Sequence, residues 1–290
     1  MKFGIAFANT GPFAGPDGAT ALGQAAEESG FDSLWTVEHV VVPKDYQSTY
    51  PYSPDGKMPG GGAFDIPDPL IWLAWVAART TTLKLGTGIL ILPQRNPVVL
   101  AKEVATLDVL SGGRVLLGVG IGWLEEEFNV LGVPFADRGP RTEEYVGAMR
   151  ALWSQDEPAF SGDTVSFTGA VMRPRPVAGA VPVIVGGHSP AAARRAGRVG
   201  DGFFPGKGDL PALLDEMRKA ADEAGRDPDA IEVSSTGASV LGGGEAAVDE
   251  VGRLAELGVH RLVVPPLSYN PADIGEALAR FGDEVIARTA

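Results

Sequence analysis

Short apolar runs with the character of β-strands alternate with longer helical stretches along the whole chain of 290 residues. Eight such runs each precede a helical stretch, which predicts parallel strands joined by helices. The predicted strands are Phe3–Ala8, Ser33–Val37, Leu83–Ile91, Val115–Val119, Val181–Val185, Gly202–Phe204, Ile231–Val240 and Arg261–Val264. The predicted helices are Gly18–Ser29, Pro69–Arg79, Val98–Leu110, Arg141–Ser154, Pro190–Arg198, Leu210–Ala224, Ala246–Leu257 and Pro271–Phe281.

Eight strand–helix units are typical of a closed (β/α)8 TIM barrel, an α/β fold of about 250 residues. A doubly wound open sheet is the main alternative, and the number of strands does not exclude it. The turn after the first predicted strand reads Ala8-Asn9-Thr10-Gly11-Pro12 and lacks the glycine spacing of a dinucleotide-binding loop. We therefore favour a single barrel domain over residues 1–290.

Two insertions interrupt the alternation. Pro43–Pro67, after the second predicted strand, is rich in proline, glycine and tyrosine. A connection of this length without regular structure usually has a function, such as that of a lid. Glu157–Gly179, after the fourth predicted helix, contains Val165-Ser166-Phe167 and is expected to form a small hairpin.

Composition excludes several classes of protein. The chain has no cysteine, which rules out disulfides, thiolate metal sites and cysteine nucleophiles. Its net charge of −13 argues against binding nucleic acid or anionic membranes. No signal-peptide pattern and no run of about 18 apolar residues is present, so we expect a cytoplasmic protein. Its expected partner is a small-molecule substrate; a homodimer is compatible with the sequence, but no residue identifies an interface.

Only three histidines occur in the chain. His39 closes the second predicted strand beside Glu38, His188 closes the fifth, and His260 opens the eighth. Catalytic residues of TIM barrels lie at the carboxyl ends of the strands, so His260 is expected to be structural. Imidazole gives or takes a proton near neutral pH, which makes His39, with Glu38 beside it, the candidate catalytic pair.

A glycine-rich turn leads from the fifth predicted strand into a helix. Gly186, Gly187, His188 and Ser189 precede Pro190, a favourable first helical residue. Glycines and a free helix N-terminus suit the binding of a phosphate. An ordinary strand-to-helix turn uses the same residues, and the commonest phosphate site of TIM barrels follows strands seven and eight instead. Both interpretations remain open.

Glycines also alternate within two strand patterns, Leu85–Leu90 and Leu117–Trp123, the second of which contains Gly120. Glycine inside a strand indicates a bulge or the close approach of a ligand to the backbone. A flat aromatic ligand over exposed backbone is one interpretation of these glycines. Tight packing in a barrel of small residues is the other.

Three charged groups give weaker signals. Glu125-Glu126-Glu127 is a possible metal ligand set, but a solvated helix start is the better interpretation. Arg194-Arg195 is expected to be a surface pair, and Asp108 and Arg114 to cap the turn between them. With three histidines and no ligand cluster, we expect no metal site.

Several stretches together resemble the bacterial-luciferase-like superfamily of flavin and deazaflavin oxidoreductases. Their sequence pattern is most similar to that of the actinobacterial members that depend on coenzyme F420. The resemblance extends from residue 1 to about residue 270. It is most specific in Leu107–Arg114, Gly118–Trp123 and Leu131–Phe135 with Arg138, and it includes Trp35–His39, Gly86–Pro97 and Gly186–Phe203.

The resemblance implies roles for particular residues. His39 matches a histidine beside the reactive ring of the cofactor, and Gly88-Ile89 matches a non-prolyl cis peptide that supports the ring from behind. Gly186–Ser189 match the loop that binds the cofactor phosphate, and Pro205-Gly206 match a further cofactor loop. Trp123 stands where the sugar-phosphate dehydrogenase branch carries its catalytic glutamate, so that branch's reaction is not implied.

The resemblance implies hydride transfer between coenzyme F420 and an organic substrate, with His39 orienting the ring or relaying a proton. The alternatives are an FMN-dependent monooxygenase that uses a separate flavin reductase, and a non-catalytic F420- or flavin-binding protein. The expected cofactor-binding residues include Gly120 of the second glycine-rich strand. The candidate residues of an apolar substrate pocket are Trp35, Tyr50, Tyr52, Phe64 and Trp123. The cations that could meet an acidic cofactor tail are Lys44, Lys57, Arg95 and Lys207.

Overall fold

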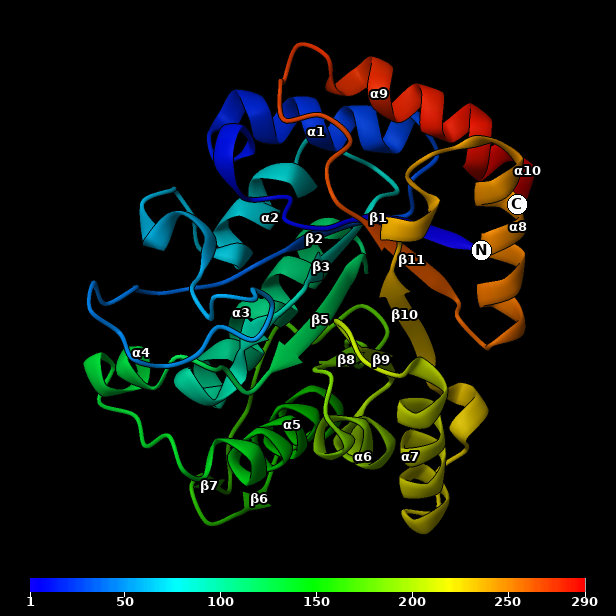
Figure 1. Cartoon of the computed structure of the whole chain (residues 1–290). Coiled ribbons are helices and arrows are strands. Elements are labelled where there is room, and N and C mark those ends of the chain that lie inside the picture. Colours follow the sequence, from blue (N-terminus) through cyan, green and yellow to red (C-terminus); the bar gives the residue numbers. More distant parts are fainter. Residues whose placement is uncertain (290) are drawn as a thin grey trace.

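The computed structural model describes residues 1–289 and contains eight parallel strands closed into a barrel (Figure 1). The barrel strands are β1 (Lys2–Ile5), β2 (Ser33–Thr36), β3 (Lys84–Thr87), β5 (Val115–Gly120), β8 (Val183–Gly186), β9 (Gly202–Phe204), β10 (Glu232–Thr236) and β11 (Arg261–Val264). The ring runs in this order, and β11 pairs with β1 to close it. The predicted TIM barrel is confirmed.

Helices surround the barrel and cover its outer face (Figure 1). They are α1 (Pro16–Glu28), α2 (Pro69–Ala77), α3 (Pro97–Ser111), α5 (Arg138–Ser154), α6 (Pro190–Val199), α7 (Leu210–Glu223), α8 (Gly244–Glu256) and α9 (Ile274–Phe281). Two shorter helices are α4 (Glu125–Val130), between β5 and α5, and α10 (Ala287–Thr289) near the end of the chain. Among residues 1–289, no helix combines the length and the apolar character needed to cross a lipid bilayer.

Three predicted strands end three or more residues earlier than expected. The predicted strand Leu83–Ile91 is divided, because β3 ends at Thr87 and the cis peptide Gly88–Ile89 separates it from β4 (Leu90–Ile91). This peptide bond confirms the non-prolyl cis peptide that the family resemblance implies. The first strand ends before Phe7, whose φ of 52° leaves the extended region, and the seventh ends before a 3-10 turn, Ala238–Val240.

Both insertions lie where the sequence predicts them. Within Glu157–Gly179, β6 (Phe160–Ser161) pairs with β7 (Ser166–Phe167) in an antiparallel hairpin, as expected. Pro43–Pro67 has a single short element, the 3-10 turn Pro59–Gly62. We call Pro43–Pro67 the insertion from here on.

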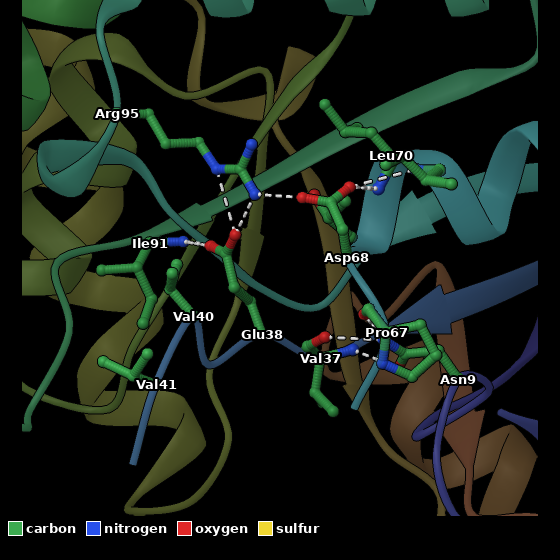
Figure 2. A network of polar contacts seen from close by, with 12 residues as sticks. Asn9, Val37, Glu38, Val40, Val41, Pro67, Asp68, Leu70, Ile91 and Arg95 are labelled. Atoms are coloured by element: carbon green, nitrogen blue, oxygen red, sulfur yellow. Dashed lines mark hydrogen bonds and ion pairs between the residues drawn. The ribbon is translucent and has the colours of Figure 1, made fainter. Parts of the chain in front are cut away.

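The side chain of Asn9 ties Val37, the residue after β2, to Pro67, the last residue of the insertion (Figure 2). Its amide nitrogen donates to the carbonyls of Val37 and Pro67, each at 2.9 Å. Its amide oxygen accepts from the backbone N–H of Val37 at 2.9 Å. Asn9 is fully buried, so satisfied polar groups inside the protein hold the end of the insertion next to the end of β2.

Trp35 fills the interior of the barrel, where it is only 1% exposed. Its Nε1 donates to the hydroxyl of Ser33 at 2.9 Å. Glycines make room for the indole: a Cβ on Gly86 would lie 2.7 Å from the ring, and one on Gly4 would lie 2.6 Å from Nε1. The prediction that Trp35 lines a substrate pocket is wrong, because its side chain belongs to the core.

Glu27, near the end of α1, lies at the amino ends of the barrel strands, beside the turn that precedes β3. One carboxylate oxygen accepts from the backbone N–H groups of Thr81, Thr82 and Leu83 at 2.8, 2.5 and 3.0 Å. Burial raises the pKa of Glu27, but the hydrogen bonds from these N–H groups and from the Thr82 hydroxyl outweigh burial and lower the pKa to about 2. The carboxylate therefore links α1 to the turn that begins β3.

A folded-state pKa below the ordinary value of 4.5 stabilises the protein above pH 4.5, and this stability is lost as the pH falls from 4.5 towards 2. Glu27→Gln is expected to lower the free energy of unfolding at pH 7 by about 1–2 kcal/mol, after allowance for solvent screening of a partly exposed group. The difference from wild type should shrink below pH 4.5 in urea titrations. The neighbouring exposed Glu28→Gln serves as the control; equal effects of the two variants would contradict the prediction.

Candidate active site at the carboxyl end of the barrel

His39 lies three residues after the end of β2, at the carboxyl end of the barrel, where TIM-barrel enzymes place their chemistry. Its Nδ1 is 3.0 Å from a carboxylate oxygen of Glu127 on α4. The Glu127 side chain is 0% exposed and that of His39 is 10% exposed. The expectation that Glu127 belongs to a solvated helix start is wrong, because its carboxylate is buried against the imidazole.

Glu38, the other candidate of the catalytic pair, points away from His39. One of its carboxylate oxygens accepts from the backbone N–H of Ile91 at 2.5 Å, and the other accepts from Arg95 Nε at 3.0 Å. Arg95 also binds Asp68 at 2.7 Å, and Figure 2 shows its guanidinium between the two carboxylates. The structure thus contradicts a catalytic role for Glu38, whose carboxylate has structural partners on both oxygens.

This network also changes the interpretation of Arg95. Burial opposes its charge, but the carboxylates of Glu38 and Asp68 outweigh burial and raise the pKa of Arg95. Asp68 in turn caps α2 by accepting from the N–H groups of Leu70 and Ile71. Arg95 was a candidate to meet an acidic cofactor tail, whereas in the structure it links Glu38, just after β2, to the N-cap of α2.

Ile89 lies at the bulge between β3 and β4 and packs over two glycines. A Cβ on Gly120, at the end of β5, would lie 2.6 Å from Ile89 Cδ1. A Cβ on Gly186, at the end of β8, would lie 2.5 Å from Ile89 Cγ2. Of the two interpretations of the glycine-rich strands, tight packing therefore applies to Gly120, and the partly exposed Ile89 presents the surface there.

The turn that contains Gly187, His188 and Ser189 leads directly into the N-terminus of α6. Ser189 is the N-cap residue, and its side chain accepts from the N–H of Ala192 at 3.2 Å. Gly187 has a φ of 130°, and a Cβ there would lie 2.7 Å from Ala192 Cβ, so this turn requires glycine. The dipole of α6 points its positive end at this turn, which suits an anionic group.

Aromatic side chains form a row across the end of the barrel from His39 to His188. His39 contacts Trp123, Trp123 contacts Tyr50, Tyr50 contacts Tyr52, and Tyr52 contacts His188, with ring centroids 5.2–5.6 Å apart. Trp123 comes from the turn after β5, and both tyrosines come from the insertion. Three of the five predicted pocket residues therefore lie together.

Phe64 does not join this row: it is 36% exposed, and its ring lies over Gly60 within the insertion. Tyr52, by contrast, lies against the turn that follows β9. A Cβ on Gly206 would lie 2.8 Å from the Tyr52 ring, and Pro205 is buried beside it. The insertion thus covers both turns that the family resemblance assigns to the cofactor.

The remaining cations of this region differ in their surroundings. Lys207 binds the carbonyl of Pro51, and its ammonium lies 5.6 Å from the Tyr52 ring centroid. Burial, and then the charge of Lys207, lower the pKa of His188. Lys57 lies over the ring of Tyr46, and Lys44 is exposed. Lys207 is therefore the cation nearest to the α6 turn among these candidates.

Other residues singled out in the sequence have structural roles. His260 Nδ1 accepts from the N–H of Val233 at 3.0 Å, which confirms the structural assignment. Arg114 donates to the carbonyl of Ser111 at 2.7 Å, and the carbonyl of Asp108 accepts from Gly113, so the expected turn cap is confirmed. Arg194 is exposed, whereas Arg195 is only 7% exposed, so the expected surface pair is half wrong.

The contact of Glu127 with His39 and the contacts of Asn9 with Val37 and Pro67 were not predicted from the sequence, and Phe7 was given no role. Phe7 follows β1 and is 45% exposed at the same end of the barrel as His39, with a positive φ that non-glycine residues rarely adopt. Backbone strain of this kind gathers at functional sites. The positive φ of Phe7 could not be predicted, because Phe7 stands in the alternating apolar pattern of the first predicted strand, where an extended backbone is expected.

Two cavities lie away from the aromatic row. One, of about 520 Å³, lies between the turns after β10 and β11 and the end of α9, and includes Arg280 and Glu284. The other, of about 350 Å³, lies between α2 and α3. Neither contains a histidine, so we place the candidate site at His39. Among residues 1–289, no group of three or more histidine, aspartate or glutamate side chains is arranged to hold a metal ion.

Similar proteins include enzymes that use a deazaflavin. An uncharacterised protein of Mycobacterium tuberculosis is 36% identical over 247 residues, covering 84% of this chain and 83% of that protein. The F420-dependent glucose-6-phosphate dehydrogenase of Kineococcus radiotolerans is 35% identical over 210 residues, covering 69% of this chain and 57% of that enzyme. This chain thus matches little more than half the length of the dehydrogenase.

Solved structures share the fold. An F420-dependent secondary alcohol dehydrogenase, in complex with an F420–acetone adduct, superposes with a TM-score of 0.78 at 20% identity over 100% of this chain and 99% of that one. The oxygenating constituent of 3,6-diketocamphane monooxygenase from Pseudomonas putida, in complex with FMN, gives 0.76 at 18% identity over the same shares. The model of the luciferase-like monooxygenase family matches residues 1–282. The chain therefore belongs to the luciferase-like monooxygenase family.

Proposed function

We propose that this protein is an oxidoreductase that transfers hydride between coenzyme F420 and an organic substrate at the carboxyl end of the barrel. The observation that carries the proposal is the position of His39, held by a buried carboxylate at the end of the aromatic row. The relationship to an F420-dependent dehydrogenase at 35% identity supports the choice of cofactor. When bound, coenzyme F420 supplies the acceptor or donor of the hydride.

The residues of this end of the barrel fit such a cofactor. Ile89 offers an apolar surface above Gly120 and Gly186 on which one face of a planar ring can rest. The turn from Gly187 to Ser189, at the N-terminus of the ten-residue helix α6, suits its phosphate. Lys207 adds a positive charge beside that turn.

The chain's own groups then have distinct tasks. His39 orients the ring or moves a proton at Nε2, since its other nitrogen is bound to Glu127. Trp123, Tyr50 and Tyr52 line one side of the site with aromatic surface and so limit the access of water to the reacting atoms. The insertion carries two of these three residues, so it contributes directly to the choice of substrate.

An anaerobic fluorescence titration of the purified protein with F420 and, separately, with FMN tests the cofactor. We expect tight binding of F420 and weak binding of FMN. Preference for FMN would overturn the proposal in favour of a monooxygenase that uses a separate flavin reductase. Tight binding of F420 without turnover over a broad substrate panel would instead indicate a non-catalytic binding protein.

Ser189→Asp tests where the cofactor phosphate binds. Aspartate caps a helix about as well as serine, so folding should be retained, but its charge repels a phosphate at the α6 N-terminus. We expect F420 binding to weaken by about tenfold or more. Asn96→Asp makes the same change of charge at the N-cap of α3 and should leave binding unchanged. Equal effects of the two variants would remove α6 as the phosphate site.

A further inference from the structure

The buried carboxylate of Glu127 has an unusual set of partners. One oxygen accepts from the backbone N–H groups of Val40 and Val41 at 2.6 and 3.2 Å. The other oxygen is 3.0 Å from Nδ1 of His39. Two of the three partners are backbone donors, so the carboxylate cannot turn away from the imidazole without also breaking its hydrogen bonds to the N–H groups of Val40 and Val41.

Helix α4 explains how a glutamate comes to be buried here. Leu124 and Phe128 are 1% and 0% exposed, and they lie within one helical turn of Glu127. These apolar residues turn the helix so that Glu127 faces the barrel, while Glu125 remains exposed. The position of Glu127 in the first turn also suits a negative charge, because the helix N-terminus is positive.

The neighbouring Glu126 faces a different segment. Its carboxylate accepts from the N–H groups of Gln47 and Ser48 at 2.6 and 3.1 Å and from the Ser48 hydroxyl at 2.7 Å. It makes no hydrogen bond with His39 among the described contacts of residues 1–289. Glu126 therefore offers a matched control, because it has the same charge on the same helix and binds the insertion instead.

A carboxylate only accepts hydrogen bonds, so the hydrogen between Glu127 and His39 belongs to Nδ1. In neutral imidazole one nitrogen carries hydrogen and the other carries a lone pair. The lone pair of His39 is thereby assigned to Nε2. Carboxylates that orient a histidine in this way fix both its tautomer and the direction of its ring.

We propose that Glu127 is the positioning residue that holds His39 in the Nδ1–H tautomer and so makes Nε2 the proton acceptor of the site. When a substrate gives up a hydride from carbon and a proton from its neighbouring oxygen, the O–H bond breaks and the carbon–oxygen double bond forms. Nε2 takes the proton, and the charge of Glu127 stabilises the imidazolium; bound coenzyme F420 would supply the acceptor of the hydride. In the reverse direction Nε2 returns the proton.

Nitrogen NMR spectroscopy of protein with isotopically labelled histidine reads the tautomer without cofactor or substrate. The chain has three histidines, and His260 is an internal reference. Its Nδ1 accepts from the N–H of Val233, so it must be the Nε2–H tautomer. We expect neutral His39 to show the opposite, Nδ1–H, pattern. An Nε2–H pattern for His39 in the wild-type protein would overturn the proposal, whatever the variants do.

Glu127→Gln is the diagnostic variant. Its amide oxygen can still accept from Val40 and Val41, while its NH₂ group donates to Nδ1 of His39. The tautomer should therefore change to Nε2–H, and turnover should fall about 10- to 100-fold with little change in F420 affinity. Glu126→Gln should leave the tautomer unchanged, and Glu127→Asp should restore the Nδ1–H form. A tautomer that is the same in wild type and Glu127→Gln would contradict the proposal.

The effect on turnover rests on the proposed function, but the tautomer does not. If F420 fails to bind while His39 shows the expected tautomers, the proposed function fails and the positioning role stands. If F420 binds and is turned over while Glu127→Gln changes neither the tautomer nor the rate, the positioning role alone is wrong.

Discussion

His39→Ala is expected to lower turnover by about 10²- to 10⁴-fold, the range that one positioned acid–base side chain contributes. The measurement follows the oxidation of reduced F420 in the presence of a substrate found by screening. The affinity for F420 should change far less, because the phosphate and ring contacts lie on other residues, such as Ser189 and Ile89. Loss of rate without loss of binding would mark His39 as a residue of the chemical step.

His260→Gln is the control for this variant, because His260 lies at the opposite end of the barrel and its side chain hydrogen-bonds only the backbone N–H of Val233 among the described contacts. It should retain the turnover of the wild-type protein. Full turnover by His39→Ala would remove its catalytic role. An equal loss in both variants would point to destabilisation of the barrel instead.

Glu38→Ala is expected to lower the free energy of unfolding by about 3–5 kcal/mol, the range for breaking a buried ion pair from one side. The variant leaves Arg95 partly buried with only Asp68 as a charged partner, and leaves the N–H of Ile91 without its acceptor. The loss in free energy of unfolding should lie near the lower end of this range, because Asp68 still compensates part of the Arg95 charge. Urea unfolding measures this difference.

Removing both partners gives the control for the Glu38 variant. The double variant Glu38→Leu with Arg95→Leu leaves no fully buried charge unpaired, because Asp68 is 35% exposed and still caps α2, so it should be more stable than either single substitution. A loss below about 1 kcal/mol for Glu38→Ala would show that the network of Figure 2 contributes little to stability.

Much of the fold could be predicted because the barrel repeats one pattern. The strands Gly202–Phe204 and Arg261–Val264 begin and end where the sequence predicts them, since each is bounded by polar residues or by a proline. The strand predicted over Leu83–Ile91 fails for a physical reason. The cis peptide at Gly88–Ile89 divides it, and although Gly86 and Gly88 indicate a bulge or a close approach, these glycines do not tell where the strand ends.

The candidate site could be predicted less completely. His39 and Ser189 follow from their places at strand ends, but the partner of His39 does not. Three successive glutamates look alike in a sequence, and only the rotation of α4 decides that Glu127 faces the barrel while Glu125 faces solvent. The prediction for Trp35 was wrong for a related reason. A strand directs alternate side chains to opposite faces, and the sequence does not show which face of β2 points into the barrel.

Glu126 and Glu127 are consecutive residues of a six-residue helix, one bound to the insertion and the other to His39. Because both carboxylates belong to one short helix, a displacement of α4 that releases Ser48 would also draw the Glu127 carboxylate away from Nδ1, whereas Glu126→Gln keeps an amide oxygen that accepts from Gln47 and Ser48 and so leaves α4 in place. The position of the insertion over the site and the direction of the imidazole are therefore thermodynamically linked, and each biases the other by the same free energy. A substitution in the insertion can consequently alter proton transfer without changing any residue that touches the substrate.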